Sequence, residues 1–325
     1  ANRLEAVRID SDAGSSRPGD PDWETARRLA MCGATTHLSL IRHFQWVHLS
    51  VGAALAMATR NQLRADHPVR RLLWPHVFGT QYSNGMITRD LLSKGGDFEG
   101  IFSFTHGGLC DLLNATADDA DLGGIHPDVD ADRRGLAEGG FATPALDNRS
   151  ALFAVMVAHT RRYLALYYPS DADLARDEEM MAWLGAVDDQ VPNGIAGVAG
   201  YGATVEGTAQ LLATAVYVAS VEHEIVGSGV WDYQLWTDVN PARVQQSGAA
   251  EGVDVYQRLV NANFNLNIRR TRLLQDFSGL AVDRPGAEAM QRFQRDLGDL
   301  QIELDRQPAA CWRMEPKFLK ANINA

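Results

Sequence analysis

The feature that most limits the fold of this chain is the long stretch from Trp23 to about Ala65, which contains no proline and few glycines. Proline breaks helices and glycine weakens them, so this stretch predicts a helix, or a helix pair, far longer than the usual ~11 to 12 residues. His67-Pro68 should stop it, because proline disfavours the helical conformation of the residue before it. Elsewhere the alternation of apolar and polar residues typical of strands is nearly absent, so we predict an all-α fold.

The remaining helices are predicted from apolar periodicity and from stop and cap signals. We expect short helices at residues 70–74 and 86–93 and longer ones at 108–115, 150–168, 170–184, 204–226, 250–276 and 286–306. Residues 1–22 and 133–149 are predicted loops, the first with a strand-like run at residues 4–9. The two most apolar segments, "LSVGAALAMA" and "AQLLATAVYVASV", fall short of the ~18 apolar residues of a membrane span, so both are predicted to be buried core helices.

Two histidines, His43 and His48, lie inside the long predicted helix in the stretch "RHFQWVH". At about 100° per residue, a spacing of five places their rings about 140° apart on an α-helix. They would share one side if the helix held an extra residue in one turn, a π-bulge, which is frequent at functional sites. A lone helix histidine is more often structural than a metal ligand, but a cluster of five within forty residues lowers the odds against a metal site: His37, His43, His48, His67 and His76.

A third imidazole is available at His223, inside the second very apolar helix in "VASVEHEIVG". A neutral ring has few reasons to be buried there unless it coordinates something. The neighbouring Glu222 and Glu224 are expected to face solvent or to cap nearby groups, with a site of two histidines and the Glu224 carboxylate as an alternative. We therefore predict a metal site built from His43, His48 and His223.

Composition and missing motifs argue against several other functions. The 30 basic and 41 acidic residues give a net charge of −11, which disfavours a nucleic-acid binder. The cysteines are three, widely spaced and without a CxxC, which predicts buried thiols in a reducing compartment. "HEIVG" lacks the second histidine of a metalloprotease box, and no GxSxG elbow occurs. No secretory signal is visible in the chain as given, so we favour a cytoplasmic location, with secretion after signal removal as the alternative.

Several of these stretches together resemble the lipoxygenase family. The segment "HLSLIRHFQWVHLSVGAALAMATRNQLRADHPVRRLLWPH" is similar to the family's long histidine-rich helix, with H-x4-H followed by HP-x-x-x-LL-x-PH. "TRRYLALYYPSDADLARDEEMMAW", "AQLLATAVYVASVEHEIVG" and "PKFLKANINA" resemble later family segments in the same order. The resemblance implies that residues 1–325 form a mainly helical lipoxygenase-like catalytic domain, with two long buried helices carrying the metal ligands and the family's N-terminal β-barrel absent.

The resemblance also implies a cofactor and a reaction. It assigns one non-haem iron, or occasionally manganese, to His43, His48 and His223, and structural roles to His67 and His76. The implied partners are O2 and a polyunsaturated fatty acid, which loses a hydrogen from the methylene between two cis double bonds and becomes a hydroperoxide. The apolar ligand helices suit this, because radical chemistry needs a water-poor pocket around a redox metal. No nucleic acid is expected as a partner, and membrane contact would be transient.

Some positions depart from the family pattern. Gly227 stands where the family usually has Asn, His or Ser as a further ligand, and the chain ends at Ala325 where family members end in a metal-binding isoleucine. Ile87 matches the position that governs O2 entry, commonly Ala or Gly, with Leu91 opposite; both are candidates to contact substrate, and core packing is the alternative. The departures keep two alternatives open: a catalytically silent lipid-binding or scaffold homologue, and a metal oxygenase or hydroperoxide-processing relative with another substrate.

Overall fold

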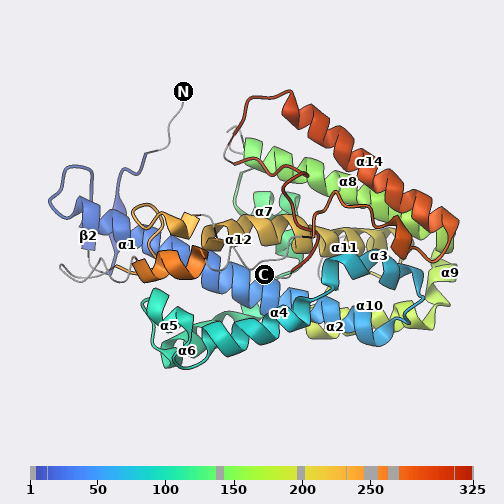
Figure 1. Ribbon diagram of the computed structural model, residues 1–325, viewed down its shortest axis with the longest axis horizontal. Helices are drawn as coiled ribbons and strands as arrows, with labels where there is room; N and C mark the ends of the chain where they lie inside the picture. The colour runs from blue at the N-terminus through green and yellow to red at the C-terminus, as the bar shows by residue number, and fades with distance from the viewer. Residues whose placement is uncertain are drawn as a thin grey trace. The chain divides into compact units, whose positions relative to one another are not determined.

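The structure, a computed structural model, describes most of the chain: residues 5–12, 14–136, 143–195, 202–231, 233–244, 255–262, 271–310 and 312–323. These residues are mainly helical, which confirms the predicted all-α class (Figure 1). Two short strands, β1 (Ile9–Ser11) and β2 (Gly14–Ser16), pair antiparallel within the expected N-terminal loop. The strand-like run was placed too early in the sequence, because the turn depends on Gly14, whose positive φ of 124° favours glycine.

The long proline-free stretch is helical from Trp23 to Gln62, in line with the prediction. Three segments follow one another without a break: α1 (Trp23–Thr36), the π-helical η1 (His37–Gly52) and α2 (Ala53–Gln62). The chain leaves the helical conformation at Leu63, which is extended. The predicted stop therefore exists, and it comes a few residues before Pro68.

His67 and Pro68 begin the next helix, α3 (Pro68–Val77). Proline suits the first turn of a helix, where its missing N–H would have no helical partner. The ring Nδ1 of His67 accepts the backbone N–H of Val69 at 3.2 Å and caps the helix, while its Nε2 lies 3.1 Å from the Asp177 carboxylate. His67 thus has a structural role.

The chain forms two compact units, each built from segments that are separate in the sequence. The smaller unit comprises Ala1–His43, Ile87–Leu113 and Val226–Ile268, and the larger one comprises Phe44–Met86, Asn114–Ile225 and Arg269–Ala325. The boundary between the units falls within η1, between His43 and Phe44.

The core of the larger unit is built on α8 (Pro144–Tyr167), which packs against both α11 (Val205–Tyr217) and α14 (Arg284–Asp305) (Figure 1). Nearly every residue of α11 is buried, which explains why that segment is apolar on all sides. A hydrogen bond of 2.8 Å from the hydroxyl of Thr160 to the carbonyl of Ala209 joins α8 to α11. The larger unit also pairs α2 with α10 (Glu178–Gln190), where the indole of Trp183 donates to the Thr59 hydroxyl at 3.1 Å.

Buried amides organise the smaller unit. Gln234 donates to the hydroxyl of Ser39 on η1 at 2.6 Å, and Gln257 donates to the carbonyl of Gln234 at 2.9 Å. These bonds satisfy polar groups in the core of the unit and hold the first turns of η1.

The remaining elements are short or flank the candidate site. They are α4 (Thr80–Met86), η2 (Ile87–Leu92), α5 (Asp97–Ile101), α6 (His106–Thr116), η3 (Ala117–Asp119), η4 (Gly123–Ile125), α7 (Pro127–Arg133), α9 (Asp171–Ala175), η5 (Val218–Glu222), α12 (His223–Trp231), η6 (Tyr233–Leu235) and η7 (Ser278–Leu280). Within the described ranges, no helix combines the length and the apolar character that crossing a bilayer requires.

Three predicted boundaries are wrong. The expected loop at 133–149 contains the start of α8, because Pro144 takes the first turn of that helix. The helix expected at 170–184 is two helices, since Asp177 accepts the N–H of Met180 and caps a second one. Of the helix expected at 250–276, residues 255–262 are helical, whereas Leu273 hydrogen-bonds to Leu319 of the C-terminal segment; residues 250–254 and 263–270 lie outside the described residues.

Candidate metal centre

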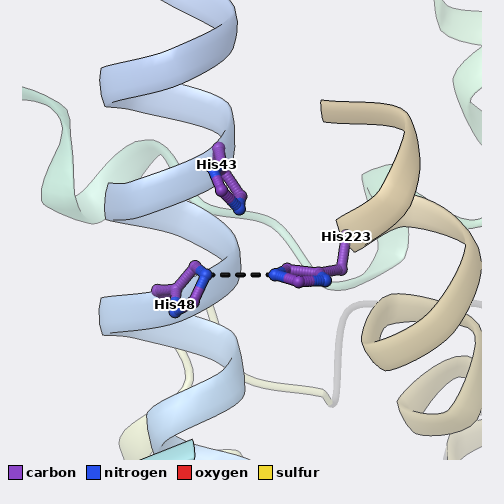
Figure 2. A group of neighbouring side chains, drawn as sticks. All are labelled: His43, His48 and His223. Carbon is purple, nitrogen blue, oxygen red and sulfur yellow. Dashed lines mark hydrogen bonds between the residues drawn. The ribbon is translucent and has the colours of Figure 1, made fainter. Parts of the chain in front are cut away.

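The structure brings together the three histidines singled out from the sequence. One ring nitrogen from each of His43, His48 and His223 lies within 4.8 Å of the other two, and all three side chains are fully buried. Figure 2 shows the rings of His43 and His48 leaving one helix on the side that faces His223, which comes from a second helix. Buried imidazoles that converge in this way are a typical donor set for a transition metal.

The widened helix η1 explains how two histidines five residues apart share one side. In π-helical geometry each residue hydrogen-bonds to the fifth residue along, so residue i+5 lies about one turn above residue i. η1 is π-helical over 16 residues, so the widening extends well beyond the single bulge that the spacing required. Gln45 and Ser50, also five apart, use the same geometry: their side chains are joined by a 3.1 Å hydrogen bond.

The third histidine also follows a widened turn. The helix that begins with α11 becomes π-helical at η5 (Val218–Glu222) and continues as α12, whose first residue is His223. An extra residue in a turn rotates every later side chain by about 100° around the helix axis. The direction of His223 therefore depends on η5.

Asn84 fixes the orientation and protonation of His48. Its amide nitrogen donates to the His48 carbonyl at 2.8 Å, and a carbonyl can only accept, so the amide oxygen is the atom that lies 3.0 Å from the His48 Nδ1. Nδ1 must then carry the proton and donate it to Asn84. The lone pair of His48 is left on Nε2, which points at the Nε2 of His223 from 3.1 Å (Figure 2).

The residues present fit a metal ion. Burial, opposed by the Asn84 hydrogen bond, lowers the pKa of His48 to about 4, so this ring is neutral and its Nε2 can coordinate at neutral pH. A hydrogen-bond acceptor on the far nitrogen of a ligating histidine is the usual outer support of such a ligand. The donor chemistry of the three rings suits iron, zinc or copper rather than the harder calcium or magnesium.

Of the two expectations for the acidic neighbours of His223, that they face solvent or that they bind nearby groups, the first is wrong, because both carboxylates lie near cations. Glu222 is only 1% exposed, and its carboxylate lies 3.2 Å from the guanidinium of Arg149. Glu224 lies 3.6 Å from the ammonium of Lys320, a lysine that is itself fully buried. Because Glu224 faces a buried cation, the three-histidine set is favoured over a site that uses its carboxylate.

The other predicted positions lie outside the histidine cluster. His37 is exposed at the start of η1, and His76 is buried with its Nδ1 2.7 Å from the Ala321 carbonyl. Ile87 and Leu91 are both buried on η2, at 4% and 5% exposure, which suits a substrate pocket and ordinary packing equally.

Gly227 and Ala325 are the two positions at which the family resemblance implied further metal ligands besides the three histidines. Gly227 is buried in α12 and has no side chain to offer a metal, so it cannot replace the usual further ligand. Ala325 lies outside the described residues.

Comparisons with known proteins find similarity to one family. Residues 11–110 match the sequence pattern of the family described as Lipoxygenase. Over 315 residues the chain is 24% identical to the linoleate 9S-lipoxygenase 2 of Oryza sativa subsp. japonica, covering 92% of this chain and 35% of the rice protein. The chain is therefore similar to the lipoxygenase family.

Two further lipoxygenase relatives define how far the likeness extends. The human hydroperoxide isomerase ALOXE3 is 28% identical over 207 residues, covering 63% of this chain and 29% of the human protein. The crystal structure of coral 8R-lipoxygenase superposes with a TM-score of 0.78 at 19% identity, covering 92% of this chain and 49% of the coral chain. The chain thus spans about a third of these curated relatives and about half of the solved one, and it shares the helical fold of the solved one.

Two supporting residues were missed by the sequence reasoning. Asn84 lies 36 residues after His48, and nothing in its local pattern signals a contact between them. Arg149 fell in a segment predicted to be a loop. The apolar surroundings of Glu222 were a usable signal, because a carboxylate in a fully apolar helix needs a buried cation.

Proposed function

We propose that this lipoxygenase-like chain binds one non-haem iron, or manganese, through His43, His48 and His223, and inserts O2 into a polyunsaturated fatty acid to give a lipid hydroperoxide. The observation that carries the proposal is the buried convergence of three imidazoles from a widened helix and a second helix. Similarity to the lipoxygenase family supports an oxygenase over other uses of a three-histidine site, and the name of the rice relative specifies linoleate for that protein.

The proposed reaction adds both atoms of O2 to one substrate. A bound iron would supply the one-electron oxidation that removes a hydrogen from the methylene between two cis double bonds. Carbon then forms a bond to O2, and the hydrogen that was lost is balanced by the one on the terminal peroxide oxygen. The net change is R–H plus O2 to R–OOH, so no other reductant is consumed.

The contribution of the protein is to hold neutral rings in a dry site. Asn84 keeps the proton of His48 on Nδ1, so that Nε2 remains available for a metal. The side chains of Phe44, Val47 and Val221 next to these ligands in the sequence are buried and apolar. A water-poor environment of this kind protects a carbon radical from side reactions.

Ile87 and Leu91 are proposed to contact the substrate chain. Their burial on η2 is compatible with a pocket wall, and the proposal predicts that Ile87→Ala alters where or on which face oxygen is added. Chiral chromatography of the hydroperoxides tests this. An unchanged product pattern, with turnover retained, would assign both residues to packing alone.

Metal content and oxygen chemistry test the proposed function directly. The full chain is produced in iron-supplemented medium, its metals are measured by elemental analysis, and oxygen uptake and conjugated-diene absorbance are followed with linoleate and arachidonate. We expect about one iron per chain and diene formation. The double variant His43→Ala/His48→Ala should lose both, while His37→Ala, an exposed histidine of the same helix, should keep both. Iron retained by the double variant would refute the ligand assignment.

Gly227 favours a second candidate, a lipid-binding homologue without turnover, because it removes a ligand position. Supplying a fatty-acid hydroperoxide in the same assay also examines the chemistry named for the human relative, hydroperoxide isomerisation. Binding of linoleate without metal or oxygen uptake would favour the silent homologue. Consumption of hydroperoxide without oxygen uptake would favour the isomerase type.

A further inference from the structure

A buried ionic cluster surrounds the turn that precedes His223. Arg149 on α8 is largely buried, and its guanidinium makes three separate contacts: to the hydroxyl of Tyr217 at 2.7 Å, to the carboxylate of Glu222 at 3.2 Å and to that of Asp130 at 3.3 Å. Tyr217 and Glu222 are 0% and 1% exposed. A guanidinium offers five donors in a rigid fork, so it can hold several partners in fixed directions.

Two of these partners bracket the widened turn η5. Tyr217 is the last residue of α11, and Glu222 is the last residue of η5, immediately before His223. On an α-helix two residues five apart would diverge by about 140°, and a single guanidinium could not reach both. In π-helical geometry they share one side. Arg149 therefore joins the two ends of the widened turn.

The cluster is balanced in charge, which makes its parts depend on one another. Arg149 and Arg134, which lies 3.3 Å from Asp130, face the two carboxylates of Asp130 and Glu222. Removing one member of a buried pair leaves an uncompensated charge, which is strongly unfavourable. Without Arg149, movement of the Glu222 carboxylate out of its buried position lowers the free energy. η5 can then contract to ordinary α-helical geometry.

We propose that Arg149 is a positioning residue that holds η5 in its π-helical form and thereby directs His223 towards His43 and His48. This inference rests on the proposed metal-binding function of the three histidines. Contraction of η5 by one residue would rotate His223 by about 100° relative to α11 and draw it along the axis by about 1.5 Å. Either displacement removes the ring from the cluster.

Metal affinity of the Arg149→Met variant tests the proposal, with Arg162→Met as a matched control. Arg162 lies on the same helix and pairs with Asp296 at 2.5 Å, so its loss also breaks an ion pair of α8 without touching η5. Metal-free full-length proteins are titrated anaerobically with Fe²⁺. We expect Arg149→Met to weaken binding about tenfold or more, in the range of lost outer-sphere support, and Arg162→Met to leave it unchanged. Equal affinity of Arg149→Met and wild type would overturn the proposal.

A second set of variants keeps the test decisive if Arg149→Met does not fold. In Arg149→Met/Glu222→Leu no buried charge is left unpaired, so stability should recover, as it often does when a buried ion pair is replaced by apolar residues. The double variant should still bind Fe²⁺ weakly, because nothing joins the ends of η5. Arg149→Lys keeps the charge and loses the fork, so its Fe²⁺ affinity should lie between those of the wild type and of Arg149→Met. Wild-type affinity in the folded double variant would contradict the proposal.

Hydrogen exchange separates failure of this inference from failure of the proposed function. Amides of residues 218–223 in the metal-free protein should exchange faster in Arg149→Met than in Arg162→Met, because the widened turn has lost its support. A wild-type protein that binds no Fe²⁺ would refute the metal site, and the exchange data would still decide the role of Arg149. Unchanged exchange in both variants would refute that role.

Discussion

The two widened segments that supply the candidate ligands are stabilised differently. η1 is π-helical over 16 residues and carries two of the histidines, whereas η5 is π-helical over 5 residues and ends just before the third. Along η1 the supporting polar contacts are spread out, from Ser39 through Trp46 and His48, each bonded to a different partner. At η5 one guanidinium joins both ends of the turn.

The difference shows that one spacing can serve two purposes. In η1 the i and i+5 pair of His43 and His48 faces the candidate metal, so the widened geometry is used directly by the site. In η5 the i and i+5 pair of Tyr217 and Glu222 faces away to Arg149, and the site receives only the resulting direction of His223. We expect η1 to tolerate the loss of a single contact better than η5 does.

The largest expected effect is a loss of folding stability at low pH. It should arise on α8, the helix that carries Arg149. His159 on α8 is buried and stacks on Phe293 with ring centres 4.2 Å apart. Burial, aided by the nearby charges of Arg162 and His76, lowers the pKa of His159 to about 3, and burial lowers that of His76 to about 4. Their neutral forms stabilise the fold fully above pH ~6.5, and this stability is lost as the pH falls towards these values.

The variant His159→Phe isolates this effect, because it keeps the stacked ring and removes the titrating group. Below pH ~6.5 the wild type should lose on the order of 1 kcal/mol more per pH unit than the variant. Urea unfolding of both metal-free proteins at pH 7, 6, 5 and 4 measures the difference. Parallel losses in the two proteins would show that His159 does not titrate on unfolding.

The next largest effect is expected at the end of η1, from Gly52→Ala. A methyl group there would overlap the carbonyl oxygen of Val47 and lie 2.7 Å from Cδ1 of Ile323. Alanine normally favours a helix over glycine by about 1 kcal/mol, so a destabilisation of about 1 to 3 kcal/mol would reverse the usual sign. Gly33→Ala in α1 meets nothing within 4 Å and is the control. Thermal denaturation should show a lowered Tm for Gly52→Ala and not for Gly33→Ala.

Asn84→Ala tests whether His48 needs its outer partner. The change should weaken Fe²⁺ binding about 10- to 100-fold, because the ring loses the acceptor that fixes its proton on Nδ1. Asn148→Ala is a close control: Asn148 is equally buried, at 7% exposure, and its amide likewise makes one donated and one accepted bond, both to the backbone of Met314. Both variants should lose stability. Equal losses of metal affinity would contradict the specific role of Asn84.

The smallest effect is expected from Trp46→Phe. It removes one hydrogen bond of 3.1 Å, from the indole of Trp46 on η1 to the Thr116 carbonyl, and keeps an aromatic ring in place. Loss of one such bond costs about 0.5 to 1.5 kcal/mol. Denaturation should report that cost, and Fe²⁺ affinity should be unchanged. A tenfold loss of affinity would mean that η1 depends on single contacts as much as η5.

The sequence predicted the parts of this molecule that local rules control. The absence of proline between Trp23 and Ala65 predicted a long helix or a helix pair, and the five-residue spacing of His43 and His48 predicted a widened helix if both histidines bind one metal. Both follow from backbone geometry alone. The class of fold and the grouping of the three histidines followed from the same reasoning together with the family resemblance.

The features that were missed depend on contacts between distant segments. The spacing required one extra residue in a turn, yet η1 is widened throughout, and its length reflects packing that no local pattern encodes. Glu222 was expected to face solvent or to cap a nearby group, and its actual partner could not be foreseen because Arg149 lies 73 residues away. Leu273 was assigned to a helix because local propensity could not reveal its pairing with Leu319.

The widened turns also limit how this site could be transplanted. A designer who grafts the triad onto a regular helical scaffold cannot copy the spacing of His43 and His48, since an ordinary helix aligns residues four apart. The second histidine would have to move back by one position, and the segment bearing the third would have to be cut by one residue. Each ligand-bearing helix of this protein can thus be replaced only by a helix that is widened at the same place.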